Sequence, residues 1–363
     1  MANLNKILIV PLDWGLGHAT RSIPLIMNLL LNNCEVYVAG EGATLALLKS
    51  EFSQVKFLPL SGYRIHYAKQ QRWLPLKIII QIPRIIFSIY HEHKWLKKIV
   101  KRYSIDAVIS DNRFGLYHSQ IPSVYITHQL LIKTGNKFSE NLLRKCHYWL
   151  IKKYTQCWIP DFEGADNIAG QLSHPSQTLP NIQYIGCLSR FEKSSTESIK
   201  YNLLILLSGP EPQRTLFENK LLLQLQQFTG NVLLVRGLPE TEKNLVLLKN
   251  SRASIVIKNH LIAEELSKVI QQSAMVICRA GYTTIMDLLK LQKKAILVPT
   301  PAQTEQEYLG RYLMQQQLFL CIGQQNFLLM DALENAAAFN FLTKEYDMEK
   351  YKQAIHQFII NGG

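Results

Sequence analysis

The feature that most constrains the fold of this chain is an alternation of short apolar runs with longer helical patterns, which occurs twice. In the first half, runs typical of buried strands cover residues 6–11, 35–39, 55–60, 107–110, 123–127 and 157–159. In the second half they cover residues 203–207, 232–235, 255–258, 275–278 and 295–299. Strands that alternate with helices pair in parallel and are covered by helices on both faces. The sequence therefore predicts an α/β protein with two doubly wound, Rossmann-like domains.

A polar segment without periodicity separates the two halves. Residues 191–200 read Phe-Glu-Lys-Ser-Ser-Thr-Glu-Ser-Ile-Lys, which is typical of a linker. The chain has 363 residues, enough for two domains. We expect a first domain at residues 1–190, a linker at 191–200 and a second domain at 201–344. A terminal helix over about residues 345–363 is expected to pack back on the first domain.

The second half contains the junction with the clearest chemical meaning, where Gly281 separates a predicted strand from a predicted helix. The first amides of a helix lack internal partners and lie at the positive end of its dipole. A strand–glycine–helix junction therefore favours a bound phosphate. Arg279 adds a positive charge beside it, and Thr283 and Thr284 are placed to cap the helix. Asp287 lies one turn further, where a carboxylate can bind a pair of sugar hydroxyls.

A second polar stretch follows the next predicted strand. Residues 299–308 read Pro-Thr-Pro-Ala-Gln-Thr-Glu-Gln-Glu-Tyr, and their amides and carboxylates (Gln303, Gln306, Glu307) suit the many hydroxyls of a sugar. Ligands of parallel sheets bind outside the carboxyl ends of the strands. We therefore expect a nucleotide-sugar site in a cleft between the two domains.

The first half opens with a glycine-containing loop, Gly15-Leu16-Gly17-His18, directly after its first strand. It partly matches the dinucleotide-binding fingerprint, but Thr20 stands where the third glycine is expected. Glu41 ends the next strand and is a candidate for the acid that binds a ribose. An NAD site therefore stays an alternative, as does a simple tight turn. His18 is a candidate general base, because the pKa of imidazole suits that task.

Two further segments have plain structural explanations. Ser208-Gly209-Pro210-Glu211-Pro212-Gln213-Arg214 joins a strand to a helix, and Ser208, Gly209 and Arg214 are able to meet a phosphate. Taken alone, it is better explained as a turn that contains prolines. Asp161-Phe162-Glu163 resembles an acidic metal-binding triplet, but we interpret it as a solvated turn and expect no metal.

The charge of the chain favours anionic partners. It carries 40 Lys and Arg against 27 Asp and Glu, a net charge of +13. Basic and aromatic residues concentrate in residues 73–102, which suits either a peripheral contact with an anionic membrane or an ordinary amphipathic helix. Nucleic acid ranks last, because no nucleic-acid-binding module is recognisable.

The cysteines and the apolar runs bear on location. The six cysteines show no metal-binding or disulfide spacing, and no run of apolar residues is long enough to span a bilayer. We expect a cytoplasmic protein, with the inner face of the cytoplasmic membrane as a possible place of action.

The Gly281 and Gln306 segments resemble the GT-B fold nucleotide-sugar glycosyltransferases, above all the branch of the peptidoglycan UDP-N-acetylglucosamine transferase. The resemblance is specific in residues 278–287 and 298–308 and weaker in the loops at Gly15 and Ser208. It implies that Arg279, Ala280, Gly281, Tyr282 and Thr283 cradle the diphosphate. It further implies that Asp287 binds the ribose, backbone near 261–263 holds the uracil, and Gln306 and Glu307 hold the sugar.

The same resemblance implies direct, inverting transfer without a metal or other cofactor. His18 is then the expected base, with Asp111 and His128 in reserve. Four departures from the family pattern concern the substrates. Asp287 stands where the family commonly has the longer Glu, and Gln306-Glu307 stands where it has paired amides. The loop Asp13-Trp14-Gly15-Leu16-Gly17-His18 has fewer glycines than the family's first loop, and Thr127-His128-Gln129 replaces an acidic motif. The expected reaction moves a hexose, with N-acetylglucosamine the first candidate, from a UDP-sugar to an acceptor hydroxyl, and a lipid-linked molecule is a candidate for the acceptor. A UDP-sugar epimerase and a non-catalytic binding protein stay open as alternatives.

Overall fold

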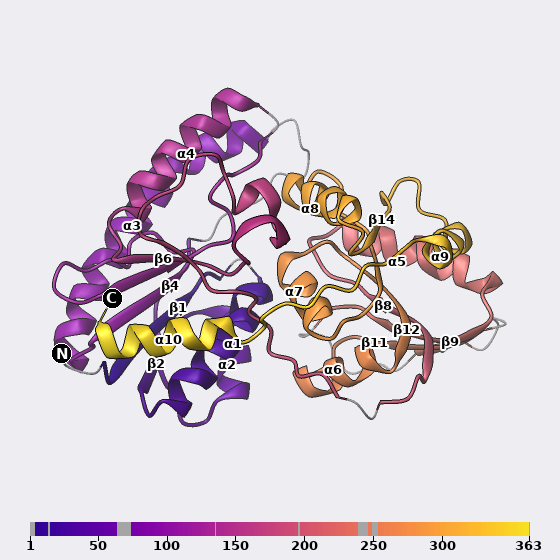
Figure 1. The fold of residues 1–363 in the computed structure, drawn as a ribbon, viewed down its shortest axis with the longest axis horizontal. Coiled ribbons are helices and arrows are strands. Elements are labelled where there is room, and N and C mark those ends of the chain that lie inside the picture. The colour runs from indigo at the N-terminus through magenta and orange to yellow at the C-terminus, as the bar shows by residue number, and fades with distance from the viewer. Residues whose placement is uncertain are drawn as a thin grey trace. The chain divides into compact units, whose positions relative to one another are not determined.

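The computed structural model describes residues 4–13, 15–63, 74–134, 136–194, 197–238, 246–248 and 253–362, with backbone only for 74–82 and 246–248. Trp14 and Trp73 therefore lie outside the described residues. The chain divides into two compact units, one formed by residues 1–189 with 347–363 and the other by residues 190–346. Each unit is an α/β layered structure around one sheet (Figure 1). The predicted fold class is confirmed.

The first unit contains a seven-stranded parallel sheet in the order β3-β2-β1-β4-β5-β6-β7. Its strands are β1 Lys6–Pro11, β2 Glu35–Gly40, β3 Lys56–Pro59, β4 Ala107–Asp111, β5 Ser123–Ile126, β6 Gln156–Ile159 and β7 Ile182–Tyr184. Its helices are α1 Leu16–Leu31, α2 Gly42–Glu51, α3 Leu74–Tyr103, α4 Lys137–Ile151 and α10 Lys350–Asn361.

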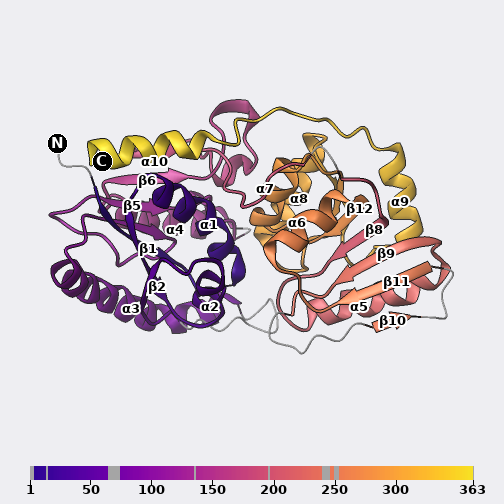
Figure 2. The same ribbon diagram turned by 90° about the horizontal axis from the view of Figure 1, so that it is seen from below.

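The second unit contains a sheet in the order β10-β11-β9-β8-β12-β13-β14, parallel except for β10 (Figure 2). Its strands are β8 Tyr201–Leu206, β9 Gly230–Val235, β10 Val246–Leu248, β11 Ala253–Lys258, β12 Ser273–Cys278, β13 Ala295–Leu297 and β14 Leu320–Cys321. Its helices are α5 Gln213–Gln224, α6 Ala263–Gln271, α7 Tyr282–Lys290, α8 Thr304–Gln315 and α9 Leu329–Ala338.

The apolar runs become the central strands because helices cover both faces of each sheet. The side chains of Ile7, Leu8, Ile9 and Val10 in β1 are fully buried, as are those of Leu203, Leu204 and Ile205 in β8. A strand buried on both faces is apolar at every position rather than at alternate ones. This is why the sequence signal was strong here, while the short edge strands β7, β10 and β14 were not predicted.

In each sheet the chain reverses its direction of growth between two central strands, β1 and β4 in the first sheet and β8 and β12 in the second. Such a switch point is where doubly wound sheets bind ligands. Pro11 pairs with Asp111 across the first switch point, and Leu206 pairs with Cys278 across the second. The loops that follow the two strands therefore begin level with one another.

The last helix of the chain belongs to the first unit. Helix α10 lies against α1 (Figure 1), and Phe358 packs edge-on against Trp158 at 5.4 Å between ring centroids. The segment between the sheets is held on the second unit, where the Ser194 amide donates to Gln271 at 2.7 Å and Glu192 pairs with Lys290 at 3.2 Å. In the described part of the chain, no helix is both long and apolar enough to cross a bilayer.

Candidate functional site

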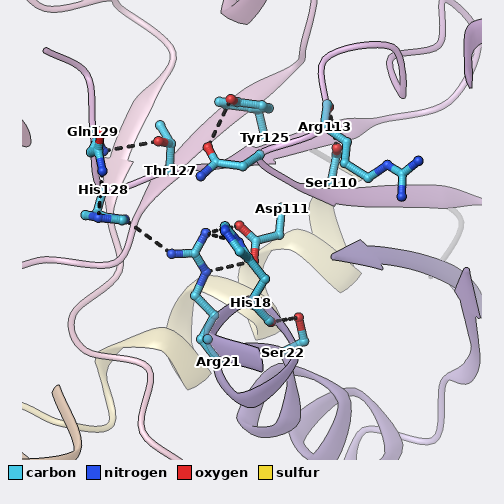
Figure 3. Close-up of polar contacts among 12 residues, drawn as sticks. His18, Arg21, Ser22, Ser110, Asp111, Arg113, Tyr125, Thr127, His128 and Gln129 are labelled. Atoms are coloured by element: carbon cyan, nitrogen blue, oxygen red, sulfur yellow. Dashed lines mark hydrogen bonds and ion pairs between the residues drawn. The ribbon is translucent and has the colours of Figure 1, made fainter. Parts of the chain in front are cut away.

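The first switch point brings His18 and Asp111 together. His18 lies in the first turn of α1, and Asp111 is the last residue of β4. Nδ1 of His18 is 3.0 Å from Oδ2 of Asp111 (Figure 3), and the His18 side chain is 16% exposed while that of Asp111 is 2% exposed. A carboxylate behind a partly exposed imidazole is the arrangement that orients a general base.

Arg21, one turn further along α1, joins this pair. Its Nε donates to Oδ2 of Asp111 at 2.7 Å, and its Nη2 also pairs with Oδ1 (Figure 3). Burial alone would raise the pKa of Asp111, but the charges of Arg21 and His18 outweigh it and lower the pKa to about 2. Burial and the Arg21 charge lower the pKa of His18, against the opposing effect of Asp111. The carboxylate is thus ionised and the imidazole is kept neutral near pH 7.

His128, which follows β5, completes the cluster. Its Nδ1 lies 3.2 Å from Nη1 of Arg21, and its Nε2 lies 3.3 Å from the side-chain amide of Gln129 (Figure 3). The Gln129 backbone amide donates to the hydroxyl of Thr127 at 3.1 Å. The structure therefore places all three candidate bases of the first domain around one guanidinium. The sequence analysis assigned no role to Arg21, although its position three residues after His18 puts it on the same helix face.

The glycine loop before α1 has a backbone requirement of its own. Gly15 has φ of 122° and forms the N-cap of α1 without a side-chain hydrogen bond, while Leu16 and Gly17 already lie in the first turn. An L-amino acid is strained at this φ, so the loop needs glycine whatever it binds. The Glu41 carboxylate, the candidate ribose acid of the NAD alternative, accepts a hydrogen bond from the Gly62 amide at 2.8 Å.

A buried network holds the loop that follows Asp111. Glu92 from α3 accepts from Nε of Arg113 at 2.7 Å, from the Tyr63 hydroxyl at 2.9 Å and from the Gly115 amide at 2.9 Å. The side chains of Arg113 and Glu92 are 0% and 1% exposed. The sequence analysis missed this pair, because its members lie 21 residues apart and only the fold joins them.

The second switch point carries the predicted phosphate seat. Helix α7 begins at Tyr282, and Gly281 is its N-cap without a side-chain hydrogen bond. The expectation that Thr283 or Thr284 caps the helix is therefore wrong, because both already lie inside α7. Ala280 and Tyr282 are buried beside the cap, and Asp287 is 7% exposed on the same helix.

Arg279 does not present its charge as expected. Its side chain is buried, and its guanidinium donates to the carbonyl oxygens of Gln213 at 3.0 Å and Val298 at 3.2 Å. It also lies 4.7 Å from the centroid of the Phe217 ring, and burial lowers its pKa to about 10. Arg279 thus joins the start of α5 and the end of β13 to the Gly281 loop, rather than adding a free charge beside it.

The loop after β8 requires a similar correction. The Arg214 guanidinium donates to Glu211 at 2.7 Å and to Glu218 at 2.8 Å, so two carboxylates already neutralise the charge expected to meet a phosphate. Ser208 and Gly209 are exposed. Gly209 has φ of 98°, and a Cβ there would lie 3.4 Å from the Thr300 hydroxyl. The loops after β8 and β13 are therefore in contact.

The predicted sugar-binding side chains support their own loop. Gln306 accepts from the Thr300 amide at 2.9 Å and also bonds to the side chain of Gln303, which is the N-cap of α8. Glu307 accepts from the Ala302 amide at 3.1 Å. Ala302 has φ of 71°, a conformation that an L-residue keeps only when its surroundings hold it. The three residues lie together: Gln306 and Glu307 hold backbone amides of their own loop, and Gln306 and Gln303 bond to each other.

The interpretation of Asp161-Phe162-Glu163 as a solvated turn is wrong for Asp161 and Phe162, because both side chains are buried. Asp161 is fully buried and accepts hydrogen bonds from the amides of Phe162, Ile168 and Ala169 and from the Ser173 hydroxyl. Across the described residues, no group of three or more His, Cys, Asp or Glu side chains is placed to hold a metal ion.

Comparison with known protein families finds one match, which covers most of the second unit and the last helix. Residues 213–359 match the glycosyltransferase family 28 C-terminal domain. No curated protein matches the chain by sequence.

Solved structures share the fold of the whole chain. MurG from Acinetobacter baumannii is 12% identical with a TM-score of 0.55, and the match covers 99% of this chain and 94% of that chain. The calicheamicin glycosyltransferase CalG4 is 10% identical with a TM-score of 0.60, covering 100% and 96%. The spinosyn rhamnosyltransferase SpnG complexed with thymidine diphosphate is 12% identical with a TM-score of 0.58, covering 98% and 96%. At these identities the likeness concerns the two-domain fold.

Proposed function

This chain is a glycosyltransferase with the GT-B fold, and we propose that it moves a hexose from a UDP-sugar to an acceptor hydroxyl by inverting, metal-independent transfer. N-acetylglucosamine is the first candidate for the hexose. The observation that carries the proposal is the β12–Gly281–α7 junction, which lies inside the domain that matches family 28.

In this proposal the second domain holds the donor. The diphosphate lies at the N-terminus of α7, where the helix dipole stabilises the charge that develops as UDP leaves. Asp287 binds the ribose hydroxyls, and backbone at residues 261–263, where α6 begins, holds the uracil. Glu307 contacts the sugar through the oxygen that does not face Ala302, and Gln306 keeps the loop in place. Arg279 and Arg214 stabilise the loops around the site through their hydrogen bonds to backbone carbonyls and to carboxylates.

The first domain supplies the base. Nε2 of His18 takes the proton of the acceptor hydroxyl, and Asp111 stabilises the imidazolium that forms. The acceptor oxygen attacks the anomeric carbon on the face opposite the departing UDP, so the configuration inverts. Stabilisation of the leaving group by backbone amides and a helix dipole explains how transfer proceeds without an essential metal.

A nucleotide panel tests the donor site. UDP is expected to raise the melting temperature of the wild-type protein, because a ligand that binds only the folded state stabilises it by about 2.7 kcal/mol at one hundred times its Kd. Asp287→Ala is expected to lose most of this shift, since the ribose loses its carboxylate. Thermal shift with UDP, TDP, GDP, CMP and NAD measures both effects.

The control for this panel is Asp331→Ala, which removes an exposed carboxylate from α9 of the same domain and is expected to keep the full UDP shift. TDP is the sharpest competitor, because SpnG is complexed with thymidine diphosphate. A shift with TDP and none with UDP would overturn the donor assignment. A shift with NAD alone would move ligand binding to the Gly15 loop.

We further propose that the acceptor is lipid-linked and that α3 binds the cytoplasmic face of an anionic membrane. Ile86, Phe87 and Tyr90 of α3 are 61%, 68% and 55% exposed. The next turns of the helix present a basic row of exposed side chains: Lys94, Lys97, Lys98, Lys101 and Arg102. An exposed apolar patch continued by lysines matches an interface with anionic lipid.

Helix α4 contributes to the same proposal. Its Phe138, Leu142 and Trp149 are 80%, 55% and 62% exposed. The two helices are linked through Tyr117, which stacks on His93 of α3 at 4.4 Å and lies 5.0 Å from Nζ of Lys153, just after α4.

Liposome sedimentation tests the membrane contact. We expect binding to vesicles that contain anionic lipid, and loss of most of it when Lys94, Lys97, Lys98 and Lys101 are all changed to Gln, because each basic residue near the surface contributes about 1 kcal/mol. A matched variant changes four exposed lysines elsewhere, Lys49, Lys268, Lys294 and Lys352, and should bind as the wild type does. Equal losses in both variants, or no binding by the wild type, would contradict a site on α3.

A further inference from the structure

The residue with the most unusual surroundings in the first domain is Arg21. Its side chain is 3% exposed and makes contacts with three titratable partners. Both oxygens of Asp111 accept from it, Nη2 lies 2.8 Å from Nδ1 of His18, and Nη1 lies 3.2 Å from Nδ1 of His128 (Figure 3). One guanidinium therefore links every candidate base of this domain.

These contacts restrict where the imidazole protons lie. A guanidinium only donates hydrogen bonds, so a ring nitrogen that faces it must accept. Nδ1 of His128 faces Arg21 and must accept, so a neutral His128 ring carries its proton on Nε2 once the neighbouring Gln129 amide turns its oxygen, rather than its nitrogen, toward the ring. Nδ1 of His18 faces Arg21 at 2.8 Å and Oδ2 of Asp111 at 3.0 Å. The first contact requires an unprotonated Nδ1, and the second requires a protonated one.

Of the two contacts of Nδ1 of His18, the hydrogen bond from Arg21 is favoured over the one to Asp111. Asp111 is already satisfied without this ring, because Nε and Nη2 of Arg21 donate to its two oxygens. A protonated Nδ1 would set an N–H against a guanidinium N–H at 2.8 Å, a contact between two donors. The titratable and charged groups that face His18 are Arg21, Asp111 and His128; burial is the first cause of the lowered pKa of His18, and the Arg21 charge adds to it against the opposing effect of Asp111.

This arrangement matters because base catalysis through Nε2 requires the opposite tautomer, with the proton on Nδ1 facing Asp111. We propose that Arg21 is a positioning residue that holds His18 with its proton on Nε2 while no acceptor is bound, so that His18 does not activate water. The proposal rests on the base role of His18 proposed above. When the acceptor binds, Nη2 of Arg21 leaves Nδ1, which gains a proton from solvent and turns to Asp111. Nε2 releases its proton to solvent, and the unprotonated Nε2 then accepts the acceptor's proton.

The tautomer is measured directly, without substrate. In protein labelled with ¹⁵N-histidine at neutral pH, we expect Nδ1 of His18 to show the chemical shift of an unprotonated nitrogen and Nε2 that of a protonated one. Comparison with His18→Gln assigns the signals. In Arg21→Lys an ammonium still pairs with Asp111 but lacks the second donor arm, so the His18 proton should move to Nδ1. A proton on Nδ1 in the wild type would overturn the proposal.

The functional test compares donor hydrolysis with sugar transfer. We expect Arg21→Lys to raise the ratio of hydrolysis without acceptor to transfer with acceptor about tenfold. Arg102→Lys, an exposed change on α3, serves as the control and should leave the ratio unchanged. A purely structural Arg21 would lower both rates together and leave the ratio at its wild-type value, which would contradict the proposal. If the wild type neither transfers nor hydrolyses a nucleotide sugar, the proposed function fails, and the tautomer measurement alone decides the role of Arg21.

Discussion

Replacing His18 by alanine is expected to lower kcat for sugar transfer by about 10²–10⁴-fold, the usual contribution of a positioned general base. Asp111→Asn should fall in the same range, because the amide cannot stabilise the imidazolium or hold the ring through Nδ1. UDP should still stabilise both variants, since the donor site lies in the other domain. Steady-state kinetics with a thermal shift on the same samples separates the two effects.

A second histidine of the first domain serves as the control for this prediction. His356 is an exposed histidine on α10, and His356→Ala should keep wild-type kcat. If His18→Ala transfers sugar at the wild-type rate while His128→Ala does not, the base assignment moves to His128 within the same cluster.

The pH dependence gives an independent check on the same base. His18 acts only when its ring is neutral, so kcat/KM is constant above the pKa of His18 and falls as pH drops through it. Burial and the Arg21 charge lower that pKa below its usual value near 6.5. The fall should therefore begin below pH 6.5 and should be absent from the residual activity of His18→Ala. A fall that begins well above pH 6.5 in the wild type would contradict a base in these surroundings.

The second large effect concerns stability. Glu92→Gln is expected to destabilise the first domain by about 3–5 kcal/mol, because it leaves the fully buried Arg113 guanidinium without its counter-charge. The loop after Asp111 should loosen as well, since the Tyr63 hydroxyl and the Gly115 amide depend on the same carboxylate. Urea unfolding measures the loss.

Tryptophan fluorescence isolates this effect, because all five tryptophans of the chain lie before residue 190. Glu51→Gln changes an exposed glutamate on α2 of the same domain and should shift the free energy of unfolding by less than about 0.5 kcal/mol. A loss of similar small size for Glu92→Gln would mean that the Glu92–Arg113 pair does not stabilise the fold.

Some residues of the site could be predicted from the sequence, and the surroundings of others could not. Gly281 and Gly15 were identified because a glycine between a strand and a helix is a local signal, and both stand at helix N-caps. The sequence did not reveal the partners of Arg279 and Arg214, for a shared reason. In a sequence, an arginine near a predicted phosphate site looks free to bind the phosphate. In the structure, Arg279 donates to the carbonyl oxygens of Gln213 and Val298. Arg214 donates to the carboxylates of Glu211 and Glu218.

Residue types and their spacing were enough to predict the two mainly parallel sheets, their helical covering and the glycine junctions after the central strands. These follow from residue type and spacing over short stretches, because burial on both faces demands continuous apolar runs. Which charged side chains pair with one another depends instead on how distant segments pack together. Arg21 and Asp111 lie 90 residues apart, and their loops come together because the chain reverses its growth between β1 and β4. Because the paired side chains are buried, they interact with each other rather than with water. No pattern over a short stretch of sequence predicts these pairs.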